Sequence, residues 1–478
     1  MADGSVRGTV RHKAYADSVT LLQVTSTVAS LSGVLDASLV MATELNREVL
    51  RESGLLFAEA SAAGPNDLVI AIRGEDAAAA DVALQAAERL LAERRPTAQT
   101  DTARQVPRSI RSARRNEPAA NLAVISVPGP YAAAEARQAL AEGMHVFLFS
   151  DNVSLEDEIE LKQRARDQGL LVMGPDCGTA ILNGVGLGFA NVVRRGRIGL
   201  IGASGTGIQE VSCLLDRAGA GISHAIGTGG RDLHEQVGAI TTLQALDLLS
   251  ADPGTDSIVL ISKPPAPAVA HTVLEAAAHI GKPVVACLLG AALEPPAGVQ
   301  VATNLYQAAR LAAPNAAWSS IGPESLPKLR RHEGQDQVRA LYCGGTLCEE
   351  AELAVGHDGG HQFIDFGDDR YTRGRAHPMI DPTLRNQAIA SALHDPAVAV
   401  LLLDVILGYG AHADPAGALA GAVCDAGRSV AVVAHVVGTT GDPQGLARQE
   451  QTLREAGVEL FGSNHHAAVA AGLLVERA

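Results

Sequence analysis

Aromatic residues and positive charge are both scarce in this chain of 478 residues. Phe, Trp and Tyr make up 3% of it, and 38 Lys and Arg residues stand against 53 Asp and Glu residues, a formal net charge of −15. Nucleic acids and anionic membranes are bound mainly through basic surfaces. The deficit therefore argues against both as main partners, although it allows one local basic site for a small acid.

Paired cysteines and long apolar runs are also missing. No Cys-x-x-Cys pair or zinc-ligand spacing occurs, so we expect reduced, buried thiols and no metal site. The longest clean apolar run, near Ala397–Leu403, is far too short to span a membrane, and the first residues lack the apolar core of a signal peptide. We expect a cytoplasmic protein. The cysteines are Cys177, Cys213, Cys287, Cys343, Cys348 and Cys424.

Apolar residues are abundant, at 47%, and they occur in short segments that alternate with helical patterns. From residue 121 onward, LAVISVPGP, YAAAEARQALAEG and MHVFLFS indicate a strand, a helix and a strand. Such alternation is typical of parallel sheets with helices on both faces. The sequence therefore predicts an α/β protein, long enough for three or four domains of roughly 150 residues each.

Composition also marks the segments that join these domains. Residues 1–95 predict a small α/β sandwich. The stretch 94–121 has three prolines, several arginines and few apolar residues, which is typical of a linker; we place that linker at 96–118. A basic loop that covers a bound anion is the alternative. A second linker is expected at 319–337.

The remaining sequence contains an internal duplication. ASGTGIQE at 203–210 aligns with CGGTLCEE at 343–350, an offset of 140, and TTLQALDLLSADP at 241–253 aligns with LRNQAIASALHDP at 384–396. Each copy predicts one doubly wound sheet. Ligands of such sheets bind at the carboxyl ends of the strands, so two packed copies could direct two helix N-termini at one anion.

A glycine-rich turn follows the strand RIGLIG and leads into the first of those helices. A Walker A loop is excluded, because Ile208 stands where the lysine must be, and the G-x-x-G-x-G order does not fit a dinucleotide fingerprint. We predict a phosphate site made by the backbone N–H groups and hydroxyls of Ser204, Gly205, Thr206 and Gly207. Tight strand–helix packing that binds nothing is the alternative.

Other residues are candidates for the remainder of the site. A second phosphate-facing turn is expected after the strand VAVLLLDVI, and a second glycine turn with an arginine could hold a carboxylate or phosphate. Lys263 would neutralise a leaving phosphate, and the polar loop 368–378 offers arginines for a small acid and a histidine as acid or base. Cys177 as nucleophile is a weaker idea, because the sequence places no base beside it. The predicted catalytic residues are Lys263, His377 and Arg375; the second phosphate turn is Gly408, Tyr409 and Gly410; the predicted substrate-binding residues are Gly229, Gly230, Arg231, Asp368, Asp369, Arg373, Arg385 and Asn386.

Several of these motifs resemble a known family. VISVPGPYAAAEARQAL, LLVMGPDCG and RIGLIGASGTGIQE are similar to the succinyl-CoA synthetase α subunit, and residues 338–475 are similar to the ligase domain of its β subunit. With FIDFGDDRYTRGRAHPMIDPTLRNQ, the whole chain resembles the FdrA family. The resemblance implies a CoA-binding-like Rossmann domain at 119–195 and two flavodoxin-like domains at 196–318 and 338–478.

The departures from the synthetases matter for function. No histidine follows the strand at 283–290, where the synthetases carry a phosphorylated one, and Ser262–Pro265 replace the segment that holds their catalytic glutamate. The resemblance to FdrA proteins implies a subunit of oxamate carbamoyltransferase in allantoin breakdown, which uses carbamoyl phosphate and an oxamate-like acid, acts with partner subunits and forms an oligomer. An acyl-CoA synthetase, with CoA as cofactor, and a non-catalytic assembly subunit remain the alternatives.

Overall fold

The computed structural model describes residues 4–14, 18–29, 31–93, 107–292, 294–318, 334–372, 375–423 and 430–476. The chain divides into two compact units, Met1–Gln105 and Val106–Ala478. Arg373, Cys424 and large parts of the two predicted linkers lie outside the described residues. None of the helices in the described ranges is both long and apolar enough to cross a membrane.

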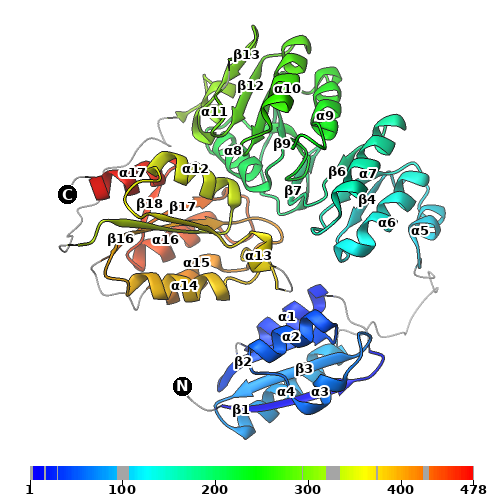
Figure 1. The fold of residues 1–478 in the computed structure, drawn as a ribbon, viewed down its shortest axis with the longest axis vertical. Helices are drawn as coiled ribbons and strands as arrows, with labels where there is room; N and C mark the ends of the chain where they lie inside the picture. Colours follow the sequence, from blue (N-terminus) through cyan, green and yellow to red (C-terminus); the bar gives the residue numbers. More distant parts are fainter. Residues whose placement is uncertain are drawn as a thin grey trace. The chain divides into compact units, whose positions relative to one another are not determined.

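The first unit is an antiparallel sheet with helices on both faces (Figure 1, blue). Strand β3 alternates in its burial: Leu68, Ile70 and Ile72 face one apolar core, with α1 and α4, and Val69 and Ala71 face another, with α2. The strand order is β1-β3-β2. Its elements are β1 (Ser5–Arg11), α1 (Ser18–Ala29), β2 (Val34–Met41), α2 (Glu44–Glu52), α3 (Ala58–Ala62), β3 (Leu68–Gly74) and α4 (Ala77–Glu93).

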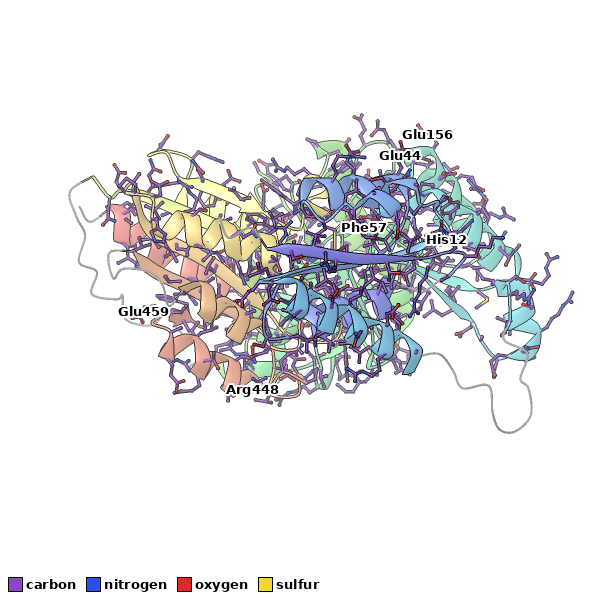
Figure 2. The ribbon with its side chains drawn as sticks, turned by 90° about the horizontal axis from the view of Figure 1, so that it is seen from below. His12, Glu44, Phe57, Glu156, Arg448 and Glu459 are labelled. Atoms are coloured by element: carbon purple, nitrogen blue, oxygen red, sulfur yellow. The ribbon has the colours of Figure 1, made fainter. Side chains whose placement is uncertain are left out.

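A loop residue closes the second face of this sheet. Phe57, labelled in Figure 2, lies so close over Gly8 of β1 that a side-chain carbon at position 8 would overlap its ring. The predicted α/β sandwich in this region therefore has a core on each side of one sheet.

The second unit contains three sheets. Its first elements are α5 (Ile110–Asn116), β4 (Leu122–Ile125), α6 (Gly129–Ala141), β5 (His145–Leu148), α7 (Leu155–Asp167), β6 (Val172–Met173), β7 (Thr179–Leu182) and β8 (Val185–Gly188). Strands β4, β5 and β6 form a parallel sheet in that order. Strands β7 and β8 precede residue 196 but join the next sheet, through the antiparallel pairing of β7 with β10.

The next sheet has seven strands in the order β13-β12-β11-β9-β10-β7-β8. Helices connect its first four parallel strands, as the apolar pattern predicts, and β13 follows β12 without a helix between them. These elements are β9 (Arg195–Gly202), α8 (Gly205–Arg217), β10 (Ile222–Gly227), α9 (Ile240–Ala251), β11 (Ser257–Ser262), α10 (Pro267–His279), β12 (Val284–Leu288), β13 (Val299–Val301) and α11 (Leu305–Ala312).

The last sheet has five parallel strands in the order β15-β14-β16-β17-β18. Figure 1 shows α12 and α17 on one face of it and α14, α15 and α16 on the other. The elements are β14 (Gln337–Tyr342), α12 (Gly345–Val355), β15 (Gln362–Asp365), α13 (Asp369–Thr372), α14 (Thr383–Leu393), β16 (Val398–Ile406), α15 (Pro415–Val423), β17 (Ala431–Val437), α16 (Leu446–Glu455), β18 (Glu459–Phe461) and α17 (Asn464–Glu476).

The two larger sheets share one topology. Numbered within each copy, the parallel strands run 2-1-3-4-5, which is the flavodoxin-like order, and its crevice for ligands lies between strands 1 and 3. In the first copy these strands are β9 and β11, and in the second they are β14 and β16. The α/β fold class is confirmed, and the shared order agrees with the internal duplication.

A common apolar core joins the two copies. It contains Leu214 of α8, Leu305 of α11, Leu347 of α12 and Ala467 of α17, together with inward residues of both sheets. Helices from both copies therefore lie between the two sheets. This packing brings the strand–turn–helix segments of the two copies together.

Candidate functional site

The first part of the site is the N-terminus of α8. Ser204 is its N-cap, in an extended conformation, and its hydroxyl accepts a hydrogen bond from the N–H of Gly207 at 2.9 Å. The first N–H groups of a helix have no partner inside the helix. Those of Gly205 and Thr206 have no acceptor among the described residues, so this helix end presents two free donors. The N–H of Gly207 and the hydroxyl of Ser204, which were also predicted to bind phosphate, already have protein partners.

The second part is the N-terminus of α12. Gly344 is its N-cap and supplies no side chain, and the N–H groups of Cys343 and Gly344 both donate to the buried carboxylate of Asp404, at 2.8 Å each. Arg385 donates to the same carboxylate at 2.8 Å. Asp404 thus fixes the turn before α12, while the N–H groups of Gly345 and Thr346 have no acceptor in the described part of the chain.

The two helix ends meet. The Ser204 hydroxyl donates to the Thr346 hydroxyl at 2.6 Å, and a side-chain carbon at Gly344 would lie 3.0 Å from Thr206. Each helix follows strand 1 of its sheet, so both ends lie at the crevice of a flavodoxin-like topology. Their dipoles therefore place partial positive charge from two directions at one location.

Two charged side chains flank this location. A side-chain carbon at Gly345 would overlap the Asp365 carboxylate at the end of β15 and would lie 2.6 Å from the Nζ atom of Lys263, which follows β11. Burial raises the pKa of Asp365 to about 6, although Lys263 and the N–H of Gly367, which donates at 2.8 Å, act to lower it. Lys263 therefore lies beside the helix ends, and its catalytic role stays a prediction.

Asp176 lies in the turn after β6, close to the second predicted glycine turn. Its side chain is exposed to solvent, but the protein atoms around it partly desolvate the charged form, and this raises the pKa of Asp176 to about 7. The charges of Asp369 and Asp151 raise this pKa further, whereas Arg231 and Lys263 lower it. A carboxyl group with this pKa can exchange a proton near neutral pH.

His377 lies on the other side of Asp365, although its ring does not carry a charge at neutral pH. Burial lowers the pKa of His377 to about 4. Its Nδ1 atom accepts the N–H of Met379 at 3.2 Å, its ring lies 5.3 Å from that of Phe189, and its Nε2 atom would lie 2.8 Å from a side-chain carbon at Gly367. With Nδ1 accepting, the proton of the neutral ring is on Nε2, where it is a hydrogen-bond donor rather than a strong base.

The second predicted glycine turn lies beside Asp176. A side-chain carbon at Gly230 would be 3.3 Å from the Asp176 carboxylate, and Gly229, at φ +88°, packs against the carbonyl of Pro175. Arg231 does not extend a free guanidinium toward a substrate. It donates to the buried carboxylate of Glu158 at 2.9 Å and to the carbonyl of Val153 at 2.8 Å.

Two further predicted substrate ligands have structural roles instead. Arg385 is buried, with its guanidinium bound to Asp404, so it supports the turn before α12 from behind and does not reach a substrate. Asn386 donates to the carbonyl of Ala418 at 3.0 Å. The sequence pattern showed polar residues near the strand ends but not the direction in which each side chain points.

The turn at Gly408, Tyr409 and Gly410 does not form the second anion site. The N–H of Gly408 donates to Gln444 at 3.0 Å, and the N–H of Tyr409 donates to the carbonyl of Ala190 at 2.8 Å. These donors are already used by the protein. The second free helix end is at Gly344–Thr346, the segment that the internal repeat aligns with Ser204–Thr206.

The polar loop after β15 is at the surface of this region. Asp368, Asp369 and Arg375 are exposed, and Asp368 pairs with Arg370 at 3.3 Å. Among the described residues, no three His, Cys, Asp or Glu side chains are grouped so that they could hold a metal ion. The described cysteines are free and buried, and burial raises the pKa of Cys177 to about 12, so its thiol is not an activated nucleophile.

Four residues of the site were not selected from the sequence: Asp176, Thr346, Asp365 and Asp404. The repeat alignment contained the signal for Thr346, because it pairs this residue with Thr206. Asp365 is the last residue of β15, and Asp404 interrupts the apolar run of β16 two residues before the strand ends; a parallel sheet places its ligand-binding residues near such strand ends.

Comparison with known proteins places this geometry in a family. The domain model "AllF, heavy metal-associated domain" matches residues 4–107, "CoA binding domain" matches 193–290, and "CoA-ligase" matches 341–474. The uncharacterized protein YahF of Escherichia coli is 42% identical over 96% of both chains. This chain is an FdrA/AllF-type succinyl-CoA synthetase-like protein.

More distant relatives share only part of this FdrA/AllF-type chain. The α subunit of the ADP-forming succinate–CoA ligase of Methanothermobacter thermautotrophicus is 30% identical, over 37% of this chain and 59% of that subunit. The chain thus spans less than two thirds of that relative. A solved acetyl-coenzyme A synthetase of Ca. Korarchaeum cryptofilum, at 17% identity and a TM-score of 0.34, covers 75% of this chain and 83% of that one; a likeness at this score carries no argument about function.

The domain descriptions name two ligands that can be tested against the residues present. Residues 4–107 contain no cysteine and a single histidine, His12, whose Nδ1 lies 3.1 Å from Asp67. Soft heavy metals prefer thiolate ligands, so this unit does not fit such a metal. The CoA-binding model supports CoA as a candidate ligand. It matches 193–290, whereas the CoA-binding likeness that we placed at 119–195 stays a prediction.

The N-terminus of α7, in the 119–195 segment, does not favour the phosphates of CoA. The first turn of α7 carries Glu156, labelled in Figure 2, followed by Asp157 and Glu158. These carboxylates place negative charge at the helix end that would otherwise attract a phosphate.

Proposed function

We propose that this chain is a subunit of a carbamoyltransferase, in which the N-termini of α8 and α12 hold the phosphate of carbamoyl phosphate. The observation that carries the proposal is the meeting of two helix ends whose first two N–H groups have no acceptor among the described residues, joined by the contact of Ser204 with Thr346. Such ends bind phosphate without a metal. The acceptor is an oxamate-like acid, and partner subunits complete the enzyme.

In this reaction the amide nitrogen of oxamate attacks the carbonyl carbon of carbamoyl phosphate. The bond between that carbon and the phosphate oxygen breaks, and phosphate leaves with the electron pair, which yields oxalurate. The nitrogen gives up one proton, and Asp176, with its pKa near 7, is the group suited to accept it. Lys263 and the two helix ends would stabilise the negative charge of the leaving phosphate.

Asp365 would act in the same step, as a hydrogen-bond donor to the phosphate. Its carboxylate lies against Gly345, where the phosphate would bind, so the protonated acid is favoured when the anion is present. A protonated Asp365 would donate a hydrogen bond to the departing phosphate. His377 as the general acid or base stays a prediction, although a pKa of about 4 makes it a weaker candidate than Asp176.

The test measures phosphate release from carbamoyl phosphate by the chain with its partner subunits, with and without oxamate. We expect release that requires oxamate. Gly205→Pro should reduce it strongly, because proline at the first helical position keeps the helix but removes one N–H donor. Gly205→Ala is the matched control, since it also adds a side-chain carbon, 3.2 Å from Thr179, but keeps the N–H. Equal activity in the two variants would contradict the phosphate site.

An acyl-CoA ligase is the second candidate function, and the matches to the CoA-binding and CoA-ligase domain models favour it. In that reaction the phosphorylated histidine would come from another chain, because residues 289–298 contain none. Incubation with γ-labelled ATP and the partner subunits separates the two functions: the ligase forms a labelled protein, and the carbamoyltransferase does not.

A further inference from the structure

The two helices that meet at the proposed phosphate site are also joined at a second, deeper point. Glu210 of α8 and Glu350 of α12 are 140 positions apart, the offset of the internal repeat, and each is the sixth residue of its helix. Both are buried. A buried carboxylate is costly unless it is fully hydrogen-bonded, so its partners show what it holds in place.

Both glutamates bind the same residue, Asn464, at the start of α17. The N–H of Asn464 donates to Glu210 Oε1 at 3.1 Å, and its Nδ2 donates to Glu350 Oε2 at 2.8 Å and to the carbonyl of Leu347 at 2.9 Å. Its Oδ1 accepts from the hydroxyl of Tyr342 at 2.9 Å. Every hydrogen-bonding group of this side chain is used, and its contacts reach both helices.

The outer oxygens of the two glutamates are anchored as well. Glu350 Oε1 accepts the N–H of Leu305 at 2.7 Å, and Glu210 Oε2 lies 2.8 Å from Nε2 of His435. The Nδ1 atom of His435 lies 2.8 Å from the carbonyl of Phe461 and must carry a proton, since a carbonyl only accepts. The cluster therefore ties α8 and α12 to elements of both sheets.

We propose that Asn464, with Glu210 and Glu350, positions the two helix ends relative to each other so that their free N–H groups act on one phosphate. This inference rests on the proposed function. The two glutamates lie about 7.5 Å along the helix axes from the first helical residues, given 1.5 Å per residue, so they and the Asn464 between them are positioning residues and not ligands. Without them the two copies would present two separate, weaker anion sites.

The geometry supplies a matched pair of variants. In the wild type both oxygens of Glu350 accept hydrogen bonds, one from Asn464 and one from the N–H of Leu305. In Glu350→Gln one oxygen is replaced by an NH2 group, so in either orientation of the amide a donor faces another donor. In Glu210→Gln the amide oxygen can still accept from Asn464, and its NH2 can donate to a neutral His435. The chemical change is the same, but only the first breaks the cluster.

The experiment is calorimetric titration of the full chain with inorganic phosphate. We expect Glu350→Gln to weaken binding about tenfold, the factor that corresponds to ~1.4 kcal/mol. We expect Glu210→Gln to remain within about twofold of the wild type, since it keeps its partners. Tyr342→Phe, a milder change that leaves Asn464 Oδ1 without its donor, should weaken binding about threefold and serves if Glu350→Gln fails to fold.

A control separates positioning from general instability. Gln449→Glu places a second carboxylate beside Asp414 on the far helix layer, so it should lower the melting temperature without changing phosphate affinity. If folded Glu350→Gln or Tyr342→Phe binds phosphate as tightly as the wild type, the positioning role is overturned but the proposed function is not. Wild-type chain that binds no phosphate would overturn both this inference and the proposed function.

Discussion

The N-termini of α8 and α12 descend from the same repeated pattern, yet their surroundings differ. The α8 end is capped by the neutral hydroxyl of Ser204, whereas the α12 end has no side-chain cap and is held by the buried Asp404–Arg385 pair, with Asp365 and Lys263 beside it. The two copies thus share free N–H groups at the helix end, but the charged side chains around that end differ. If the proposed phosphate site is right, the α8 end would attract an anion equally at every pH near neutrality, whereas the α12 end would depend on the protonation of Asp365.

The largest expected effect concerns the support of the α12 turn. Asp404→Ala should lower the free energy of unfolding by about 3–5 kcal/mol, because it leaves Arg385 buried without its partner. Ser262, which ends the corresponding strand β11, donates only to the carbonyl of Lys263. Ser262→Ala should cost about 1 kcal/mol. Urea unfolding of both variants measures the difference, and similar losses would remove the contrast between the two turns.

A smaller effect is expected from adding a methyl group to each helix end. Gly345→Ala should weaken phosphate binding and destabilise the chain by about 1–3 kcal/mol, since the new carbon overlaps Asp365. Gly205→Ala meets only Thr179 at 3.2 Å and should change both quantities less. Calorimetry with phosphate and thermal unfolding test this order. The reverse order would place the crowded end at α8.

Because Asp365 lies beside the N-terminus of α12, anion binding at this helix end should depend on pH. Sulfate keeps its charge across the neutral range, so its affinity reports the protein groups. As the pH rises through about 6, Asp365 loses its proton beside Gly345, and sulfate should bind more weakly, on the order of tenfold. In Asp365→Asn this dependence should be largely absent. A wild-type affinity that stays constant from pH 5 to 8 would contradict the role of Asp365.

The smallest effect is expected at the turn that the sequence suggested as the second anion site. Tyr409 is exposed, and the N–H groups of Gly408 and Tyr409 donate to protein acceptors. Tyr409→Ala should therefore leave phosphate affinity within experimental error. A clear loss of phosphate affinity would instead indicate that this turn binds the anion and that the N-terminus of α12 contributes less.

Local patterns were sufficient to predict much of the fold. Apolar runs that alternate with helical segments predict the parallel sheets, and the glycine turn before α8 predicts one free helix end. Both features depend on residues that are near each other in sequence. The repeat alignment also contained the second end at Gly344–Thr346. The sequence instead predicts the turn at Gly408–Gly410, because the acceptors that use its amides, Gln444 and the carbonyl of Ala190, are distant from it in the chain.

The sequence by itself determined the fold class, the duplication and the two strand–turn–helix segments, since spacing and residue type are local properties. Only the tertiary structure decided which donors stay free, which arginines are buried in ion pairs, and which carboxyl groups gain a raised pKa. These properties depend on how closely the two copies pack and on the exclusion of water between them, as for Asp365 and Asp404.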